Sequence, residues 1–248
     1  VSRGISRAAD PEKAAHDLRD EMLSIQLRLQ REGRGGMWSA RKTPQPAALS
    51  PMAGQIADGL LEAGCVKFGE FTLKSGLISP IYIDLRQLIT YPKLLAQVAS
   101  AYLPILRGLL FERLAALPYA AIPIATAISL QSGWPMIYPR KEVKTYGTKA
   151  EIEGEFHPGE QVVVIDDLAT TGGSKFEAIQ RLQTADLKVS DVVVLIDRQS
   201  GAAQALEQAG YRMHAVLTLG AMLDYWEESG RVAEEKLGAT RRFLAENG

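Results

Sequence analysis

The sequence predicts an α/β protein built on a largely parallel, twisted sheet flanked by helices. Three apolar segments support this prediction: VVVID (162–166), VVVLID (192–197) and HAVLTL (214–219). A continuous apolar run without polar alternation is typical of a strand buried on both faces of a parallel sheet. Helix-like segments such as KFEAIQRLQ (175–183) separate these strands. Strands that alternate with helices in this way are typical of α/β sheets.

The elements before this alternation are expected in a fixed order. A helix at about 52–63 leads into extended segments at about 65–73 and 80–85, and a helix follows at about 92–112. Residues 31–51 are rich in Gly, Arg and Pro without a sustained period, which is typical of a linker. Before this segment, Asp10 and Pro11 make a helix start, and an amphipathic helical pattern continues to about residue 30.

The most informative chemistry lies where the first apolar strand ends. Asp166 and Asp167 are followed by the turn LATTGGS (168–174), which opens onto a helix. Such a turn leaves several backbone N–H groups facing one place, and that place binds phosphate. Acids beside a phosphate site favour a hydroxylated sugar phosphate as ligand. The alternative is an ordinary Gly-rich turn with an Asp pair that caps the helix. The segment is neither a Walker loop nor a GxGxxG fingerprint.

A basic segment, YPRKEVKTYGTKAEIEGEF (138–156), is the second chemical feature. Arg140, Lys141, Lys144 and Lys149 lie within ten residues of one another. A charge run of this kind is usually a solvated face. Near a phosphate site, however, the cations could neutralise a diphosphate leaving group, and mobile basic loops do so in other enzymes. We therefore expect this segment to be a lid.

Composition narrows the function classes. The chain has 248 residues, 46% hydrophobic and 23% charged, with a formal net charge of −1. No basic field would draw it to nucleic acid, and no apolar run is long enough to span a bilayer. Cys65 is the only cysteine, and the three histidines lack metal-ligand spacing. We expect a cytoplasmic enzyme without a nucleic-acid partner, a membrane partner or a protein-ligated metal.

Longer motifs resemble a known family. The pattern VVVIDDLATTGGS (162–174) resembles the phosphoribosyl-pyrophosphate (PRPP) signature of type I phosphoribosyltransferases. With FGEFTLKSGLISPIYIDLR (68–86), RKEVKTYGT (140–148) and LIDRQSG (195–201), the chain resembles orotate phosphoribosyltransferase, most closely the form found in bifunctional UMP synthases. The resemblance covers about residues 52–245.

The resemblance implies a fold and a reaction. The fold would be that of a type I phosphoribosyltransferase, with a smaller hood from the N-terminal part of the domain. Orotate and PRPP would give orotidine 5'-monophosphate and diphosphate in pyrimidine (UMP) biosynthesis. The enzyme would be a pentosyltransferase and a homodimer whose lid reaches the neighbouring site. Two alternatives stay open: a phosphoribosyltransferase for another base, or a regulatory binding module with this fold.

The resemblance also assigns roles to residues. Lys144, Asp166 and Asp167 would be catalytic, and magnesium would arrive with PRPP, without a direct protein ligand but with water bridging to Asp166 or Asp167. Orotate would be bound by Lys74, Tyr82, Ile83, Thr170 and Arg198. PRPP would be bound by Tyr119, Ala120, Arg140, Lys141, Lys144, Tyr146, Asp166, Asp167, Leu168, Ala169, Thr170, Thr171, Gly172, Gly173 and Ser174.

Two positions depart from the bacterial pattern. Many bacterial members carry Lys where this chain has Ala120, and His where it has Tyr146. No ionisable His would therefore serve the lid. Because orotate is already an anion, the expected mechanism needs no strong base and depends on alignment, charge neutralisation with magnesium and exclusion of water.

The N-terminal segment carries a separate resemblance. VSRGISRAADPEKAAHDL (1–18) resembles the last strand and helix of orotidine 5'-monophosphate decarboxylase, with Arg3 and Gly4 as phosphate-binding residues. About thirty residues cannot build a barrel of about 250. We expect a remnant at 1–30, a linker at 31–51 and the phosphoribosyltransferase domain at 52–248, as the C-terminal part of a fusion with an upstream decarboxylase. The alternative is an ordinary amphipathic helix.

A short decarboxylase-like pattern is expected to be a coincidence. Residues 186–191, DLKVSD, match the DxKxxD signature of decarboxylases. In a decarboxylase that signature follows a barrel strand, whereas here it follows a helix and precedes the strand VVVLID. We expect a surface loop and no decarboxylase activity in this chain.

Overall fold

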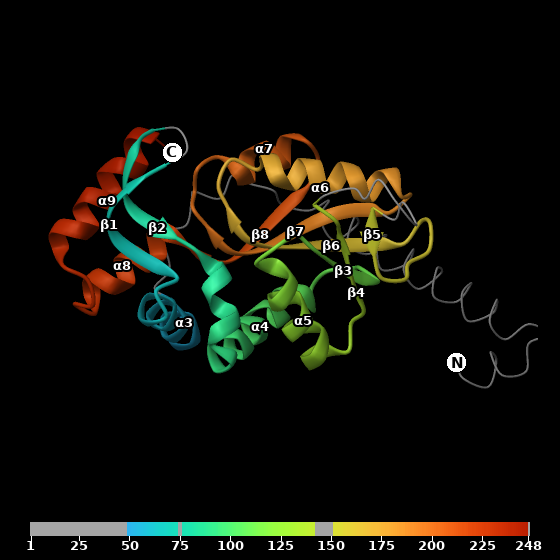
Figure 1. Ribbon diagram of the computed structural model, residues 1–248, viewed down its shortest axis with the longest axis horizontal. Helices are drawn as coiled ribbons and strands as arrows, with labels where there is room; N and C mark the ends of the chain where they lie inside the picture. Colours follow the sequence, from blue (N-terminus) through green and yellow to red (C-terminus); the bar gives the residue numbers. More distant parts are fainter. Residues whose placement is uncertain (1–48, 74–75, 142–150, 248) are drawn as a thin grey trace, which may run out of the picture. The chain divides into compact units, whose positions relative to one another are not determined.

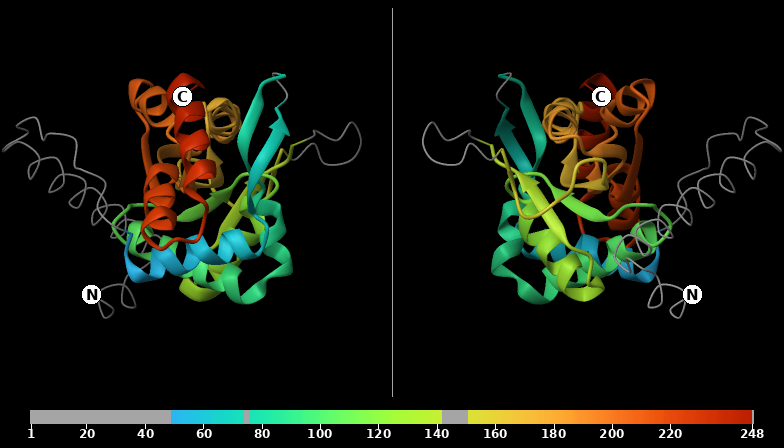
Figure 2. Two further views of the ribbon diagram at one scale, coloured as in Figure 1. Left: turned by 90° about the vertical axis from the view of Figure 1, so that its left-hand side faces the viewer. Right: turned by 90° about the vertical axis from the view of Figure 1, so that its right-hand side faces the viewer.

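The computed structural model describes residues 49–73, 76–141 and 151–247 (Figures 1 and 2). Lys74, Lys144, Tyr146 and the N-terminal segment 1–48 lie outside the described residues. The central element is a six-stranded sheet in the order β5-β4-β3-β6-β7-β8. Its strands are β3 (Arg113–Ala116), β4 (Met136–Pro139), β5 (Ile152–Glu153), β6 (Gln161–Ala169), β7 (Lys188–Asp197) and β8 (Arg212–Thr218).

The sheet is parallel except at one edge. β3 pairs in parallel with β4 and β6, and β6, β7 and β8 continue in parallel, whereas β5 pairs antiparallel with β4. The three strands predicted from apolar runs are β6, β7 and β8. The prediction of a largely parallel sheet is therefore confirmed.

Helices cover both faces of this sheet (Figure 1). The α6 (Gly173–Thr184) and α7 (Ala202–Gln208) helices lie on one face, and α4 (Pro92–Leu106) and α5 (Ala121–Ser132) lie on the other. Alternate residues of β6 serve the two faces: Val162 and Val164 pack in the core under α6 and α7, while Val163 and Ile165 pack with α4 and α5. This double burial explains why the strand has no polar alternation.

A second, smaller group of elements forms the hood. The antiparallel hairpin of β1 (Val66–Thr72) and β2 (Ile78–Ile83) follows α3 (Pro51–Glu62) and leads into the 3-10 helix η1 (Leu85–Thr90). Two helices from the end of the chain, α8 (Leu219–Glu228) and α9 (Glu234–Asn247), lie beside this hairpin (Figures 1 and 2). Phe68 of β1 meets the buried Trp226 of α8 edge to face, with ring centroids 5.7 Å apart. The hood therefore draws on both ends of the domain.

Two predictions about elements were wrong. The helix expected at 92–112 ends at Leu106, because the chain turns at Arg107 and Gly108 and must begin β3 at Arg113. The DLKVSD segment is not a surface loop, since β7 already begins at Lys188. Its last residue, Asp191, is buried and pairs with Arg212 at 2.7 Å and with His214 at 2.8 Å. These contacts give Asp191 a structural role between β7 and β8.

Within the part of the chain that the structure describes, we find no helix with the length and apolar character needed to cross a membrane.

Candidate active site

The turn after β6 has the geometry expected of a phosphate site. Thr170 to Gly172 connect the strand to α6, and Gly172 adopts a left-handed conformation with φ of 90°. An L side chain disfavours this conformation, so glycine is required there. The backbone N–H groups of residues 171–174 have no hydrogen-bond partner within the described ranges. They lie at the positive end of the α6 dipole, where an anion is stabilised.

The turn is also fastened to the neighbouring strand. The Arg198 N–H donates to the Ala169 carbonyl at 2.9 Å, and the Ala202 N–H donates to the Thr170 carbonyl at 3.1 Å. Both donors come from the segment after β7. The segment after β7 therefore holds the turn at the sheet edge, which is where ligands bind in open α/β folds.

The two acids have different surroundings. Asp166 is 6% exposed, and its Oδ2 accepts a hydrogen bond from Lys175 Nζ at 2.7 Å, while its Oδ1 accepts one from the Asp167 N–H at 2.9 Å. The Tyr102 hydroxyl donates to the Asp166 carbonyl at 2.8 Å. Asp166 is thus fully engaged by the protein.

Asp167 lines a cavity together with Asp166. Burial, followed by the negative charge of Asp166, raises the pKa of the Asp167 carboxyl well above its usual value. No cation of the described residues pairs with it. A carboxyl in this position is suited to accept hydrogen bonds from sugar hydroxyls or from metal-bound water.

The cavity brings the two predicted segments together. It has a volume of about 310 Å³ and lies between the end of β6, the start of α6 and the end of β4. The predicted residues that line it are Arg140, Lys141, Asp166, Asp167, Leu168, Thr170 and Ser174, and they are joined by Leu117, Pro118, Glu177, Ala178 and Arg181, which the sequence analysis did not single out. Acid pair, phosphate turn and basic segment therefore share one cavity.

The described cations of the basic segment are held at the rim of the cavity. The Arg140 side chain pairs with Glu153, and the Arg140 carbonyl accepts a hydrogen bond from Arg181 of α6. Lys141 Nζ lies 5.1 Å from the ring centroid of the exposed Tyr119. Ala120 is buried at the start of α5. The base of the predicted lid is thus positioned beside the phosphate turn.

Arg198 has an incomplete set of partners. It lies at the end of β7, and its Nε is buried without a hydrogen-bond partner in the described part of the chain. Its guanidinium lies 5.9 Å from the ring centroid of Phe243 in α9, and burial lowers the pKa of this guanidinium. An unpaired buried donor on an arginine is what a site needs to bind a planar acceptor edge.

The other residues expected to bind orotate, apart from Thr170, lie on the hood or outside the residues that the structure describes. Tyr82 stacks on Phe71 within the β1/β2 hairpin, with centroids 5.3 Å apart, and Ile83 follows it. Neither of these residues nor Arg198 lines the cavity of about 310 Å³. Tyr82 therefore lies outside the cavity beside the phosphate turn. Lys74, Lys144 and Tyr146 stay predictions from the sequence.

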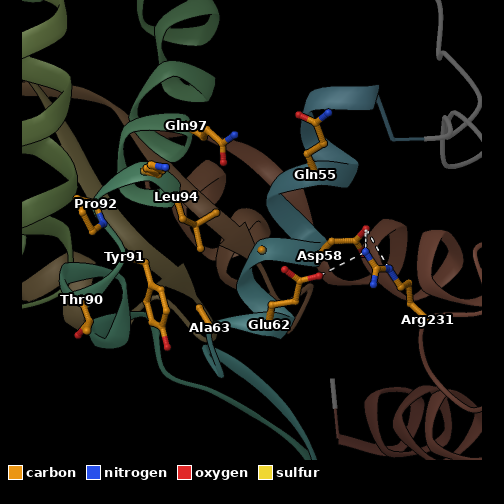
Figure 3. Close-up of a pocket in the computed structure, with 12 residues that line it drawn as sticks. Gln55, Asp58, Glu62, Ala63, Thr90, Tyr91, Pro92, Leu94, Gln97 and Arg231 are labelled. Carbon is orange, nitrogen blue, oxygen red and sulfur yellow. Dashed lines mark hydrogen bonds and ion pairs between the residues drawn. The ribbon is translucent and has the colours of Figure 1, made fainter.

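A larger cavity of about 840 Å³ lies elsewhere in the domain (Figure 3). It is bounded by α3, the start of α4 and Arg231, and it shares no lining residue with the first cavity. Arg231 faces Asp58 and Glu62 and pairs with them at 3.1 and 3.4 Å. Its cation is thus neutralised by acids, and this cavity does not belong to the phosphate site.

The acidic side chains at the site fit a magnesium ion that arrives bound to a substrate. No group of three or more His, Cys, Asp or Glu side chains suited to a metal occurs in residues 49–73, 76–141 and 151–247. Both acids line the cavity, but Asp166 pairs with Lys175, so Asp167 is the acid of the pair without a cation partner among the described residues. One carboxyl cannot hold Mg²⁺ alone, but it can add to a set of diphosphate oxygens and waters.

The fold and the phosphate turn together define a type I phosphoribosyltransferase. Among curated proteins, the orotate phosphoribosyltransferase of Methanopyrus kandleri is 41% identical over 164 residues, which cover 66% of this chain and 88% of that enzyme. The chain belongs to the orotate phosphoribosyltransferase family. No family model matches the sequence.

Longer relatives and solved structures agree with this assignment. The bifunctional enzyme PyrF/PyrE of Nostoc sp. is 44% identical over 71% of this chain but only 37% of its own length. The structure of Leishmania donovani UMP synthase covers 98% of this chain and 48% of its own, with 43% identity and a TM-score of 0.74. A Mycobacterium tuberculosis orotate phosphoribosyltransferase solved with PRPP covers 69% of this chain at 29% identity and a TM-score of 0.59. The chain spans less than half the length of these bifunctional relatives.

Proposed function

We propose that residues 52–248 form an orotate phosphoribosyltransferase that transfers the phosphoribosyl group of PRPP to orotate, with release of diphosphate, in pyrimidine biosynthesis. The observation that carries this proposal is the row of unpartnered backbone N–H groups at residues 171–174, beside a cavity that Asp167, Thr170 and Ser174 line. This arrangement suits a molecule that combines a phosphate with sugar hydroxyls. Membership of the family supports orotate as the base.

The reaction would need little chemistry from the protein. The orotate ring nitrogen would form a bond to the sugar carbon C1 as the bond from that carbon to the diphosphate breaks. The turn at 171–174 would hold the 5'-phosphate, and Asp167, with Asp166 behind it, would orient the ribose hydroxyls. Arg140, Lys141 and Lys144 would neutralise the leaving diphosphate.

Two further groups complete the proposed site. Arg198, with its unpaired Nε, would bind the polar edge of orotate. Magnesium, when bound through the diphosphate and near Asp167, would supply additional positive charge for the leaving group. The charge of orotate is on its carboxylate, and the proton of the reacting ring nitrogen would pass to the departing diphosphate, so no side chain has to act as a strong base.

The assembly around this domain is also part of the proposal. The bifunctional relatives support an upstream orotidine 5'-monophosphate decarboxylase domain, with residues 1–30 as its last strand and helix and 31–51 as a linker. We further propose a homodimer in which the lid reaches the partner's site, and a cytoplasmic location. Decarboxylation is not expected from this chain alone.

A substrate panel tests the activity. The purified chain is mixed with PRPP and magnesium, and consumption of orotate, uracil, adenine and hypoxanthine is followed separately. Consumption of orotate with release of diphosphate is expected. Loss of uracil or of a purine, with orotate unchanged, would refute the substrate assignment while leaving the phosphate site intact. A protein that binds PRPP but consumes no base would favour a regulatory module.

A further inference from the structure

Lys175 is buried in the first turn of α6, directly after the phosphate turn. Its side chain is 2% exposed, and it is among the largest fully buried side chains of the described residues. An ammonium group in this place is unusual, because lysine is rarely fully buried and the N-terminus of a helix disfavours a cation. A buried charge of this kind requires close partners.

Two oxygens on β6 are the partners of Lys175. Its Nζ donates to Asp166 Oδ2 at 2.7 Å and to the Leu168 carbonyl at 2.8 Å. One partner is a side chain and the other is main chain two residues further along the strand. The lysine therefore fixes the direction of the strand end relative to the first turn of α6, in addition to neutralising a carboxylate.

The same strand end is fastened from the opposite layer. Tyr102 of α4 is fully buried and donates to the Asp166 carbonyl at 2.8 Å. Because α4 and α6 lie on opposite faces of the sheet, these contacts connect both helix layers through Asp166. The acid at the centre of this connection has both carboxylate oxygens engaged, which leaves Asp167 as the acid of the cavity without a cation partner among the described residues.

We propose that Lys175 is a positioning residue of the sugar-phosphate site, which holds the amides of residues 171–174 at a fixed distance from Asp167. The proposal rests on the proposed function, because it assumes that one ligand contacts both groups. A ligand with a phosphate at one end and hydroxyls at the other would then be bound by two preorganised points. Lys175 itself would not touch the ligand.

The competing explanation is that Lys175 only neutralises Asp166. Three variants separate the explanations. Lys175→Met keeps the length of the side chain but removes the charge, and the double variant Lys175→Met/Asp166→Asn removes both charges of the pair. Asp166→Asn alone is the reference for the double variant, because Asp166 lines the cavity and its loss can weaken binding directly. Lys188→Met is the matched control, since Lys188 is exposed at the start of β7. The probe is ribose 5-phosphate, whose binding is measured by calorimetry, and thermal unfolding is recorded for each protein.

The positioning role predicts separate responses of stability and binding. Lys175→Met should unfold at a lower temperature and bind ribose 5-phosphate about 10- to 100-fold more weakly, because small displacements in a binding site have effects of this order. The double variant should recover stability but bind ribose 5-phosphate more weakly than Asp166→Asn alone, since the link between β6 and α6 is still missing. In steady-state assays both variants of Lys175 should raise KM for PRPP more than they lower kcat.

Other outcomes would overturn the proposal. If the double variant regains stability and binds ribose 5-phosphate as tightly as Asp166→Asn alone, Lys175 serves only to balance a charge. If Lys175→Met binds ribose 5-phosphate as the wild type does, the residue is not a positioning residue. A wild type that binds ribose 5-phosphate but acts on another base would refute only the proposed function.

Discussion

At the scale of residues, the two neighbouring acids at the end of β6 show how one dipeptide serves two purposes. Asp166 accepts hydrogen bonds from Lys175 and from the Asp167 N–H, whereas Asp167 has no cation partner among the described residues. Both carboxyls line one cavity and interact with each other, so the difference between them is the buried Lys175, which pairs with Asp166 alone. The sequence analysis placed both acids at the site but could not assign them different surroundings.

Asp167→Asn is expected to weaken binding of sugar phosphate while stabilising the fold at neutral pH. The pKa of Asp167 is raised in the folded state by burial and by Asp166, so the native protein holds this proton more tightly than the unfolded chain. The stability of the wild type should therefore fall as pH rises above the usual carboxyl value of 3.8. The amide carries no charge and avoids this cost.

Thermal unfolding of both proteins at about pH 4 and about pH 8 checks this expectation. The stability advantage of Asp167→Asn should be present at the higher pH and should shrink at the lower one. Binding of ribose 5-phosphate should be weaker at either pH. A variant that is less stable than the wild type at pH 8 would show that the acid has a structural role.

Residues that the sequence analysis missed share one property. Lys175, Arg181 and Tyr102 act through partners that are distant in sequence or on another element, such as the Arg140 carbonyl for Arg181. One feature of the sequence could have identified Lys175. It lies on the apolar face of its helix, in register with Ala178, Ile179 and Leu182. A charged residue on a buried helix face indicates a specific partner.

At the scale of elements, the junction of β6 and α6 depends on one glycine. Gly172 has a φ of 90°, whereas its neighbour Gly173 has space for a Cβ, with no atom within 4 Å. Gly172→Ala should lower the free energy of unfolding by about 1–2 kcal/mol, since an L side chain disfavours the left-handed conformation. It should also weaken phosphate binding, because the amides of the turn would shift.

Gly173→Ala provides the matched comparison for stability. Urea unfolding should show a lower free energy of unfolding for Gly172→Ala than for the wild type, and almost no change for Gly173→Ala. Equal losses would mean that the conformation of Gly172 is not what the turn requires.

The start of β3 is tied to the loop before β6 by a largely buried ion pair. Arg113 Nε lies 2.5 Å from Glu160 Oε2, and hydrogen bonding to Arg113 lowers the pKa of Glu160 from 4.5 to about 2. The stabilisation is therefore present above pH 4.5 and is lost as pH falls towards 2. Arg113→Met should lower the free energy of unfolding by about 3 kcal/mol at pH 7, because it leaves a buried carboxylate without the arginine cation.

Urea unfolding at about pH 7 and about pH 3 measures this contribution. The difference between Arg113→Met and the wild type should be smaller at the lower pH, where Glu160 begins to take up a proton. Arg107→Met, at an exposed position after α4, is the control and should change little. A difference that is independent of pH would indicate lost packing of the arginine rather than a lost ion pair.

At the scale of the whole molecule, the proposed dimer with a shared lid makes a prediction about mixtures. Lys144→Ala should lower kcat much more than affinity for orotate, because the charge is needed chiefly as diphosphate leaves. Asp167→Asn should also be nearly inactive. If the lid of one subunit serves the other's site, hybrid dimers of the two variants contain one intact site.

Activity of the mixture therefore tests the arrangement. After subunit exchange at random, about a quarter of the sites should be intact, and activity should rise to that level above either variant alone. Gel filtration should give a mass near twice 27.0 kDa. A mixture that stays inactive, although subunits exchange, would place the lid and the acid pair of each site in the same subunit.

The sequence by itself determined the class of fold, the order of most elements and the place of the phosphate turn. These features are local: apolar runs show burial on both faces, and a strand followed by acids, glycines and a helix has few other conformations. The predicted helix at 92–112 was too long at its C-terminal end, because the end of α4 depends on where β3 must begin.

Only the tertiary structure decided which groups share a cavity and which of the two acids is paired with a cation. The hood hairpin is packed against α8 and α9, more than a hundred residues away in sequence, and Lys175 reaches back to β6 through the protein interior. Such contacts depend on how layers pack, and a periodic pattern along one chain carries no information about distance between layers. The division of roles between Asp166 and Asp167 follows from that packing.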